Sequence, residues 1–327
     1  HRFRIDSELL KDNTPGDPTI RPLVVYTPPG YDESERYPLF MDLVGYTGSG
    51  LSHLNWKPFG MNLPQRLDRL IQDEKMGPVI AVLPDCFTAY GGNQYINSSA
   101  TGRYMDYLID EVIPFVESQF SVWPGREHRA VFGKSSGGFG ALTHGLLRPD
   151  VWGACACHSG DAYFEFAYLP DLPDLLTELA KHGESVERFL AAIWAKEKLS
   201  KAESMALMMI GMAAHYDPDP QAPLGFNLPM DVHTGELIRE RWQRWLAHDP
   251  VRQVDRYADS LRRLKGLYID CGTQDQFKLL WGARILHQKL SALGIAHAYQ
   301  EFDDDHSDID YRMNESLPFL YRKVSGP

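Results

Sequence analysis

The feature that most constrains the fold of this chain is a regular alternation of short β-rich runs with longer helical patterns. Runs rich in Val, Ile and aromatic residues predict strands, over residues 22–27, 38–44, 79–83, 129–132, 152–157, 267–271 and 298–302. Apolar residues at near-helical spacing predict helices between them, over residues 63–73, 104–120, 138–147, 282–293 and 311–322. Such alternation is typical of a mostly parallel sheet with helices on both faces, so we expect an α/β fold.

The alternation stops in the middle of the chain. From Pro170 to about Trp245 the sequence is mostly helical and has no obvious strand. This region holds a methionine-rich apolar stretch, followed by a Pro- and Gly-rich segment over residues 217–229. We interpret it as a helical cap insertion, residues 166–249, within a core domain formed by residues 1–165 and 250–327. The alternative is that these helices pack on the core without acting as a lid.

Composition and charge narrow the classes of partner. The chain has 327 residues, of which 43% are hydrophobic and 24% charged, values ordinary for a globular protein with a deep core. Its formal net charge of -11 argues against nucleic acid or an anionic membrane surface as a partner, because those attract basic patches. No run of apolar residues is long enough to predict a transmembrane helix.

The four cysteines lie in or beside apolar runs, at Cys86, Cys155, Cys157 and Cys271. We interpret them as buried free thiols, which favour a reducing compartment and therefore a cytoplasmic location. The sequence has no CxxC motif and no paired Cys/His spacing typical of zinc sites. We therefore expect neither a metal nor a cofactor.

A candidate nucleophile lies in residues 133–137, which read Gly-Lys-Ser-Ser-Gly and fit the pattern G-x-S-x-G. An apolar strand precedes this segment and an Ala- and Leu-rich helix follows it, as a nucleophile elbow requires. Glycine two residues before and after the serine removes side chains that would collide with neighbouring backbone. Only Ser135 has glycine at both positions, so we expect Ser135 rather than Ser136 to be the nucleophile. The backbone N–H of Ser136, at the start of the helix, would then point to a developing oxyanion.

This segment has two other interpretations. One is a Gly-rich strand–helix turn that carries no chemistry. The other is a phosphate-binding loop, which fits less well because the sequence lacks both G-x-x-x-x-G-K-[ST] and G-x-G-x-x-G here.

A serine hydroxyl needs a general base, and in this arrangement the chain order is Ser, then Asp or Glu, then His. His306 follows the last predicted strand, whereas His297 opens that strand, so we expect His306 to be the base. The acid should follow the preceding strand, where Asp275 lies in a loop after Gly272. Its rival Asp270 lies inside the apolar run and is more typical of a buried structural carboxylate satisfied by backbone donors. We expect Asp275 to orient the imidazole.

Taken together, these motifs resemble the "Putative esterase" family, which includes esterase D, feruloyl esterases, enterochelin esterases and mycolyltransferases. The resemblance runs over the whole sheet domain and rests on Pro28-Pro29-Gly30-Tyr31, the strand ending in Val44-Gly45, Gly133-Lys134-Ser135-Ser136-Gly137-Gly138, Cys271-Gly272-Thr273-Gln274-Asp275 and His306-Ser307. It implies an α/β-hydrolase fold, no metal, and acyl-ester chemistry through an acyl-enzyme. It also implies a second oxyanion donor just after Val44-Gly45, which we assign to the backbone N–H of Tyr46, with Thr47 as the alternate. Members often have His-Gly where this chain has Val-Gly.

The expected function is that of a serine carboxylesterase acting on a small or aromatic acyl ester. An acyltransferase with the same triad and an inactive binding module of the same fold are the alternatives. We expect Trp56, Asn93 and Tyr95 to line the substrate pocket, although residues 91–95 are equally compatible with a surface turn. The expected partner is a small-molecule ester, with no nucleic acid and no membrane, and a homo-oligomer stays open.

Overall fold

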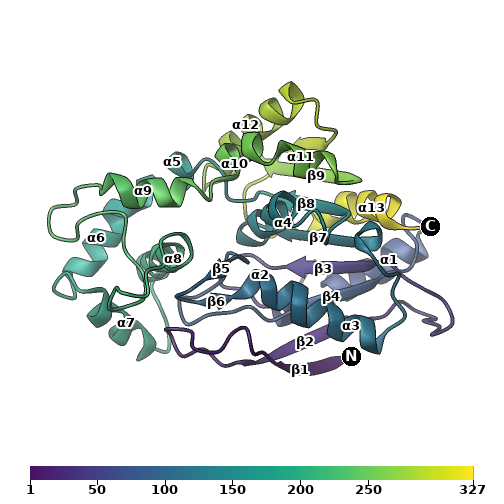
Figure 1. The fold of residues 1–327 in the computed structure, drawn as a ribbon, viewed down its shortest axis with the longest axis horizontal. Coiled ribbons are helices and arrows are strands. Elements are labelled where there is room, and N and C mark those ends of the chain that lie inside the picture. The colour runs from purple at the N-terminus through teal and green to yellow at the C-terminus, as the bar shows by residue number, and fades with distance from the viewer. Residues whose placement is uncertain (327) are drawn as a thin grey trace.

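The computed structural model describes residues 1–326, and an eight-stranded sheet forms its centre (Figure 1). Its strands are β1 (Arg2–Asp6), β2 (Ile20–Tyr26), β3 (Leu39–Leu43), β4 (Ile80–Pro84), β7 (Arg129–Lys134), β8 (Ala154–His158), β9 (Gly266–Gly272) and β10 (Ala298–Phe302). They follow the order β1-β2-β4-β3-β7-β8-β9-β10. Strand β2 is antiparallel to both β1 and β4, whereas all later neighbours in this order are parallel. A separate hairpin joins β5 (Asn97–Ser98) and β6 (Gly102–Arg103).

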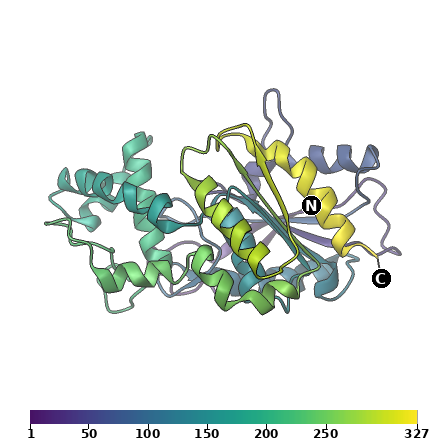
Figure 2. The ribbon, with the colours of Figure 1, turned by 90° about the horizontal axis from the view of Figure 1, so that it is seen from above.

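Helices cover both faces of the sheet (Figures 1 and 2). On one face lie α1 (Leu63–Gln72) and α13 (Met313–Val324), whose buried side chains pack with sheet residues such as Phe40 and Phe132. The other face is covered by α3 (Ile113–Gln119), α4 (Ser136–Leu147), α10 (Pro250–Arg256), α11 (Ala258–Arg262) and α12 (Leu279–Ala292). Because both faces are covered, every residue of the central strands β3 and β4 is buried, which explains their continuous apolar sequences. The expected α/β fold is confirmed.

The helix predicted over residues 104–120 has three parts. A short α2 (Tyr104–Asp106) leads into a π-helical segment, η2 (Tyr107–Val112), which continues into α3. Pro114 lies at the start of α3. Proline has no N–H to donate and its ring crowds the preceding turn, so a wider turn at this point relieves the conflict.

The structure also contains an edge strand that the sequence pattern did not predict. Strand β1 is short and its side chains are mostly exposed or half-buried. It therefore lacks the apolar run that identified the other strands, and its pairing with β2 decides its conformation. The helix after the elbow begins at Ser136, two residues before the predicted start at Gly138.

The chain between β8 and α10 forms a helical group beside the carboxyl ends of the parallel strands (Figure 1). Its helices are α5 (Phe164–Ala167), η4 (Leu169–Asp171), α6 (Leu172–Ala180), α7 (Val186–Trp194), α8 (Lys201–Tyr216) and α9 (Arg239–Leu246). Helix α8 comes so close to the sheet domain that a Cβ on Gly211 would lie 2.1 Å from the Tyr46 hydroxyl. This contact joins the helical group to the loop after β3.

Among residues 1–326, no helix combines the length and the apolar character needed to cross a membrane.

Candidate active site

The turn from β7 into α4 holds Ser135 in a strained backbone conformation, with φ 56° and ψ -126°. Its N–H donates to the His158 carbonyl at 2.9 Å, and its own carbonyl accepts from the Phe139 N–H at 2.8 Å. These bonds tie the turn to β8 on one side and to the first turn of α4 on the other. The serine is therefore held at the carboxyl edge of the sheet.

The glycines around Ser135 are required by the closeness of β3. A Cβ on Gly137 would lie 1.8 Å from the Leu43 carbonyl oxygen, and one on Gly133 would lie 2.3 Å from the same atom. Neither gap admits a side chain. The G-x-S-x-G pattern is therefore a steric condition of this turn.

His306 and Asp275 form a buried pair at the same edge of the sheet. The imidazole Nδ1 lies 2.7 Å from Asp275 Oδ2, and both residues are 6% exposed. The other carboxylate oxygen, Oδ1, accepts the backbone N–H groups of Phe277 at 2.9 Å and Leu279 at 3.3 Å. The Phe277 ring packs edge-on against the imidazole, with 4.8 Å between ring centroids. The imidazole is thus oriented by a carboxylate that is itself held in place.

The loops that carry these two residues pack tightly against each other. A Cβ on Gly272 would lie 2.4 Å from the Asp304 carbonyl oxygen. The N–H of Thr273 donates to the Phe302 carbonyl at 2.8 Å, and the N–H of Gln274 donates to the Asp304 carbonyl at 3.0 Å. Parallel pairing of β9 with β10 brings the two loops together, since the carboxyl ends of parallel strands lie at one edge.

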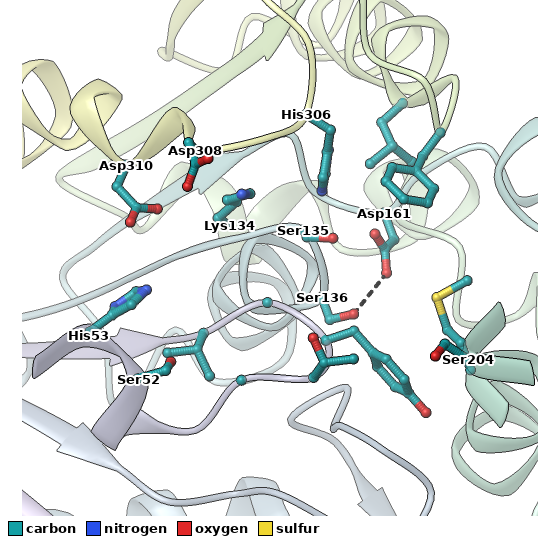
Figure 3. A pocket seen from close by; sticks show the side chains of 18 of the residues that line it. Ser52, His53, Lys134, Ser135, Ser136, Asp161, Ser204, His306, Asp308 and Asp310 are labelled. Atoms are coloured by element: carbon teal, nitrogen blue, oxygen red, sulfur yellow. Dashed lines mark hydrogen bonds between the residues drawn. The ribbon is translucent and has the colours of Figure 1, made fainter. Parts of the chain in front are cut away.

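Ser135 and His306 line one cavity of about 520 Å³. Figure 3 shows the His306 ring directed toward Ser135. Among the described residues no hydrogen bond joins the Ser135 hydroxyl to the imidazole. In enzymes without a bound substrate, such catalytic hydrogen bonds are often long or misaligned. The sheet edge thus brings together the serine, the histidine and the carboxylate from three distant parts of the chain.

The loop after β3 presents Tyr46 to this cavity and is anchored from behind. The Tyr46 hydroxyl donates to the Tyr90 carbonyl, and the Thr47 N–H donates to the Gly91 carbonyl at 2.8 Å. The Thr47 amide is therefore occupied, whereas within residues 1–326 the Tyr46 N–H has no hydrogen-bond acceptor. Of the two amides considered for an oxyanion, only that of Tyr46 is available.

A family model described as "Putative esterase" matches residues 18–314 of this chain. The chain belongs to this family. This family member is 31% identical over 149 residues to an endo-1,4-beta-xylanase/feruloyl esterase of Xylanibacter ruminicola. That match covers 42% of this chain and 19% of the relative, so the chain spans a small part of the relative's length.

Solved structures of the same architecture cover nearly the whole of this family member. A ferulic acid esterase superposes with a TM-score of 0.63 at 19% identity, covering 99% of this chain and 98% of that one. An S-formylglutathione hydrolase from Staphylococcus aureus gives a TM-score of 0.60 at 14% identity, covering 98% of each chain. These likenesses establish the α/β-hydrolase fold.

The structure corrects the expectation that Trp56, Asn93 and Tyr95 line the cavity of this esterase-family protein, since none of them does so. Trp56 is 79% exposed, on the surface. Asn93 and Tyr95 are buried, and the Tyr95 hydroxyl donates to the Val44 carbonyl at 2.6 Å. The segment that carries Asn93 and Tyr95 is thus neither a pocket wall nor a surface turn, because it supports the loop of Tyr46 from below.

Asp270, the alternative to Asp275, is a buried structural carboxylate, as expected. Its hydrogen bonds come from side chains, however, and not from backbone donors. Its Oδ1 lies 2.7 Å from His158 Nδ1, and its Oδ2 accepts from Tyr268 and Arg312, both at 3.0 Å. The other nitrogen of His158 lies 2.7 Å from the Ser316 hydroxyl. This Ser–His–Asp group is fully buried, so it links β8, β9 and α13 and has no access to a substrate.

Asp161 is a cavity residue that sequence analysis did not single out. It lies three residues beyond the end of β8, and its position after a parallel strand was the available signal. Its Oδ2 lies 2.7 Å from the Tyr168 hydroxyl and 3.3 Å from the Ser136 hydroxyl (Figure 3). Burial raises the pKa of Asp161, and the Tyr168 hydrogen bond and the His306 charge oppose that shift.

The end of the cavity farther from Asp161 is rich in charged groups (Figure 3). His53 Nδ1 lies 2.5 Å from Asp42; burial lowers the pKa of His53, but the Asp42 charge and hydrogen bond outweigh it and raise the pKa overall. Lys57 pairs with Asp310. Burial lowers the pKa of Lys134, which has no ion-pair partner among the residues described.

Within residues 1–326 no group of three or more His, Cys, Asp or Glu side chains is placed to hold a metal ion.

Proposed function

We propose that this chain is a serine carboxylesterase that hydrolyses a small or aromatic acyl ester, with Ser135, His306 and Asp275 as its triad. The observation that carries this proposal is the arrangement at the sheet edge. A strained elbow serine and a histidine line one cavity, beside an unoccupied backbone amide, and a buried carboxylate holds the histidine from behind. Membership of the esterase family supports the same chemistry.

In the proposed mechanism the Ser135 hydroxyl oxygen attacks the ester carbonyl carbon while His306 Nε2 takes its proton. Asp275 accepts the hydrogen bond from Nδ1–H and stabilises the imidazolium. The carbonyl oxygen becomes an oxyanion, which accepts the backbone N–H groups of Ser136 and Tyr46.

The tetrahedral intermediate then collapses. The bond to the alcohol oxygen breaks, the alcohol leaves with the proton from His306, and the acyl group stays on Ser135. Water loses a proton to the same imidazole and attacks the acyl carbonyl. The bond to Ser135 then breaks, the Ser135 oxygen takes the proton back from His306, and the acid leaves. No step requires a metal or a cofactor.

The cavity favours an aromatic acyl group. Its volume of about 520 Å³ lies within the range of sites for small ligands, and part of its wall is apolar or aromatic, formed by Ala167, Tyr168, Met205, Met208, Phe277 and Leu279. The relatives named as feruloyl or ferulic acid esterases point to the same class of ester.

We also propose that the helical group, residues 166–249, is a cap that forms part of this site. Ala167 and Tyr168 from its start, and Ser204, Met205 and Met208 from α8, line the cavity together with the elbow. The methionines are flexible, so this wall can adapt to acyl groups of different shape.

The test is a panel of p-nitrophenyl and feruloyl esters of graded chain length, combined with fluorophosphonate labelling of the active serine. We expect labelling at Ser135 and the highest kcat/KM with aromatic or short acyl groups. An inactive binding module would show neither labelling nor turnover. An acyltransferase would instead transfer the acyl group to an added alcohol in preference to water, which the ratio of products measures.

The proposed partner is a small-molecule ester. The cytoplasmic location stays a prediction, supported by four cysteines that are all buried and unpaired.

A further inference from the structure

Asp161 has a carboxylate oxygen that the protein leaves without a partner. The residue is 7% exposed and lines the cavity beside the elbow. All of its donors bind Oδ2, namely the Tyr168 hydroxyl at 2.7 Å, the Ser136 hydroxyl at 3.3 Å and the Gln94 amide at 3.4 Å. Among residues 1–326 none donates to Oδ1. Oδ1 is not one of the fully buried polar atoms that lack a partner, so it is open to the cavity, where water or a bound ligand can supply the donor.

Two chains of hydrogen bonds end on Asp161, and their direction makes its carboxylate an acceptor. The Gln94 amide donates to the Ser136 hydroxyl at 2.7 Å, so that hydroxyl is free to donate onward to Asp161. The Tyr168 hydroxyl donates to Asp161 and lies 3.2 Å from the Tyr216 hydroxyl, which can donate to it in turn. Each chain ends in a hydroxyl group that donates a hydrogen bond to the carboxylate. Both chains therefore favour Asp161 as an acceptor.

Asp161 also lies next to the atoms of the proposed reaction. Ser136 supplies the proposed oxyanion donor with its backbone and contacts Asp161 with its side chain. An acyl group on Ser135 would thus have the first carbons beyond its carbonyl near Asp161. In the pose that we infer, the leaving oxygen lies within reach of His306, which must protonate it, and the acyl carbons face the carboxylate.

The cavity wall near Asp161 includes His306, whereas the residues that the helical group adds to the lining are apolar or uncharged and include Ala167, Met205 and Met208. The other carboxylates of the lining, Asp308 and Asp310, belong to the charged end, away from Asp161 (Figure 3). Asp161 is therefore a single charged acceptor in the apolar part of the site.

We propose that Asp161 is a specificity-determining residue whose Oδ1 accepts a hydrogen bond from a hydroxyl or ammonium group on the second or third carbon of the acyl part. This proposal rests on the proposed esterase function. It predicts that the protein prefers hydroxy-acyl or amino-acyl esters to unsubstituted esters of the same length.

The test compares ethyl butanoate with ethyl 2-hydroxybutanoate, 3-hydroxybutanoate and 2-aminobutanoate, with acid release followed by pH-stat. We expect at least one substituted ester to exceed butanoate by about tenfold or more in kcat/KM, because a charge-assisted hydrogen bond is worth at least one factor of ten. The amino ester separates ion pairing from hydrogen bonding to a hydroxyl. Equal rates for all four esters would overturn the proposal.

Asp161→Asn keeps the shape of the side chain. The amide oxygen can take the place of Oδ2 and accept the hydrogen bonds from the protein. The amide N–H₂ then takes the place of Oδ1, so a donor replaces the free acceptor. We expect the preference to disappear, so that the ratio of kcat/KM for the substituted ester to kcat/KM for butanoate falls by about tenfold or more. The matched control is Asp308→Asn, which removes the same charge from the other end of the cavity and should retain the preference.

Two outcomes would overturn the assignment to Asp161. One is an unchanged preference in Asp161→Asn. The other is an equal loss with all four esters, which would mean that Asp161 only positions Ser136. If Asp161→Asn does not fold, the wild-type comparison of the four esters decides.

Failure of the esterase function itself is distinct, because the wild-type protein would then neither label with fluorophosphonate nor hydrolyse any ester.

Discussion

Ser135 is the residue on which the proposed chemistry depends most directly, because its hydroxyl oxygen forms the bond to the acyl group. We expect Ser135→Ala to lower kcat/KM by about ten-thousandfold or more. Ser136→Ala is the matched control, since it removes a neighbouring hydroxyl but retains the backbone N–H that an oxyanion needs, and it should cost less than about tenfold. Ester hydrolysis and fluorophosphonate labelling measure both variants. Labelling of Ser135→Ala at the wild-type level would contradict the assignment.

The glycines of the elbow make a separate prediction at the same scale, for stability. In Gly137→Ala the new methyl group would lie 1.8 Å from the Leu43 carbonyl oxygen, so backbone must move. We expect the free energy of unfolding to fall by about 3 kcal/mol or more, measured by denaturant titration. Gly60→Ala is the control, because its nearest neighbour would be 3.4 Å away, at ordinary contact distance, and should change stability by less than about 0.5 kcal/mol. Similar losses in both variants would count against the steric explanation.

At the scale of elements, the contact between α8 and the loop after β3 couples the helical group to the site. A methyl group at residue 211 would lie 2.1 Å from the Tyr46 hydroxyl but 3.2 Å from the ring carbon that bears it. We therefore expect Gly211→Ala to destabilise the wild-type protein by about 1–3 kcal/mol and to cost less when combined with Tyr46→Phe. A double-mutant cycle of unfolding free energies measures this coupling, and strictly additive effects would rule it out.

At the scale of the whole molecule, buried neutral histidines make stability depend on pH. Burial lowers the pKa of both His144 and His215 from 6.5 to about 4. The Trp152 indole N–H donates to His144 Nδ1 at 3.1 Å, so that nitrogen must be unprotonated in the folded protein. Between these pH values the unfolded chain binds more protons, so stability is present above pH 6.5 and is lost as the pH falls toward 4.

Each of these histidines should contribute a slope of about 1.4 kcal/mol per pH unit within that window. Denaturant unfolding at pH 7, 6 and 5 measures the total slope. His144→Gln can still donate to the Tyr95 carbonyl and accept from Trp152 but cannot titrate, so we expect it to reduce the slope by about one proton. The same slope in wild type and variant would refute this explanation.

Much of the fold could be predicted because its signals are local. The central strands are buried on both faces and therefore read as continuous apolar runs, and the elbow requires small residues at fixed spacing around Ser135. The exposed edge strand β1 escaped prediction because its sequence has no such run. The chain order of serine, acid and base placed His306 and Asp275 after consecutive strands, and the structure brings them within 2.7 Å of each other.

The sequence by itself thus determined the layers of the molecule and the loops that carry the candidate triad, since helix period, strand burial and turn sterics act between neighbours in the chain. Only the tertiary structure decided what surrounds the serine. It placed Tyr95 beneath the Tyr46 loop, left Trp56 on the surface and brought Asp161 against Ser136. These contacts join residues many positions apart, and which of them form depends on how the elements pack, a property that no local pattern encodes.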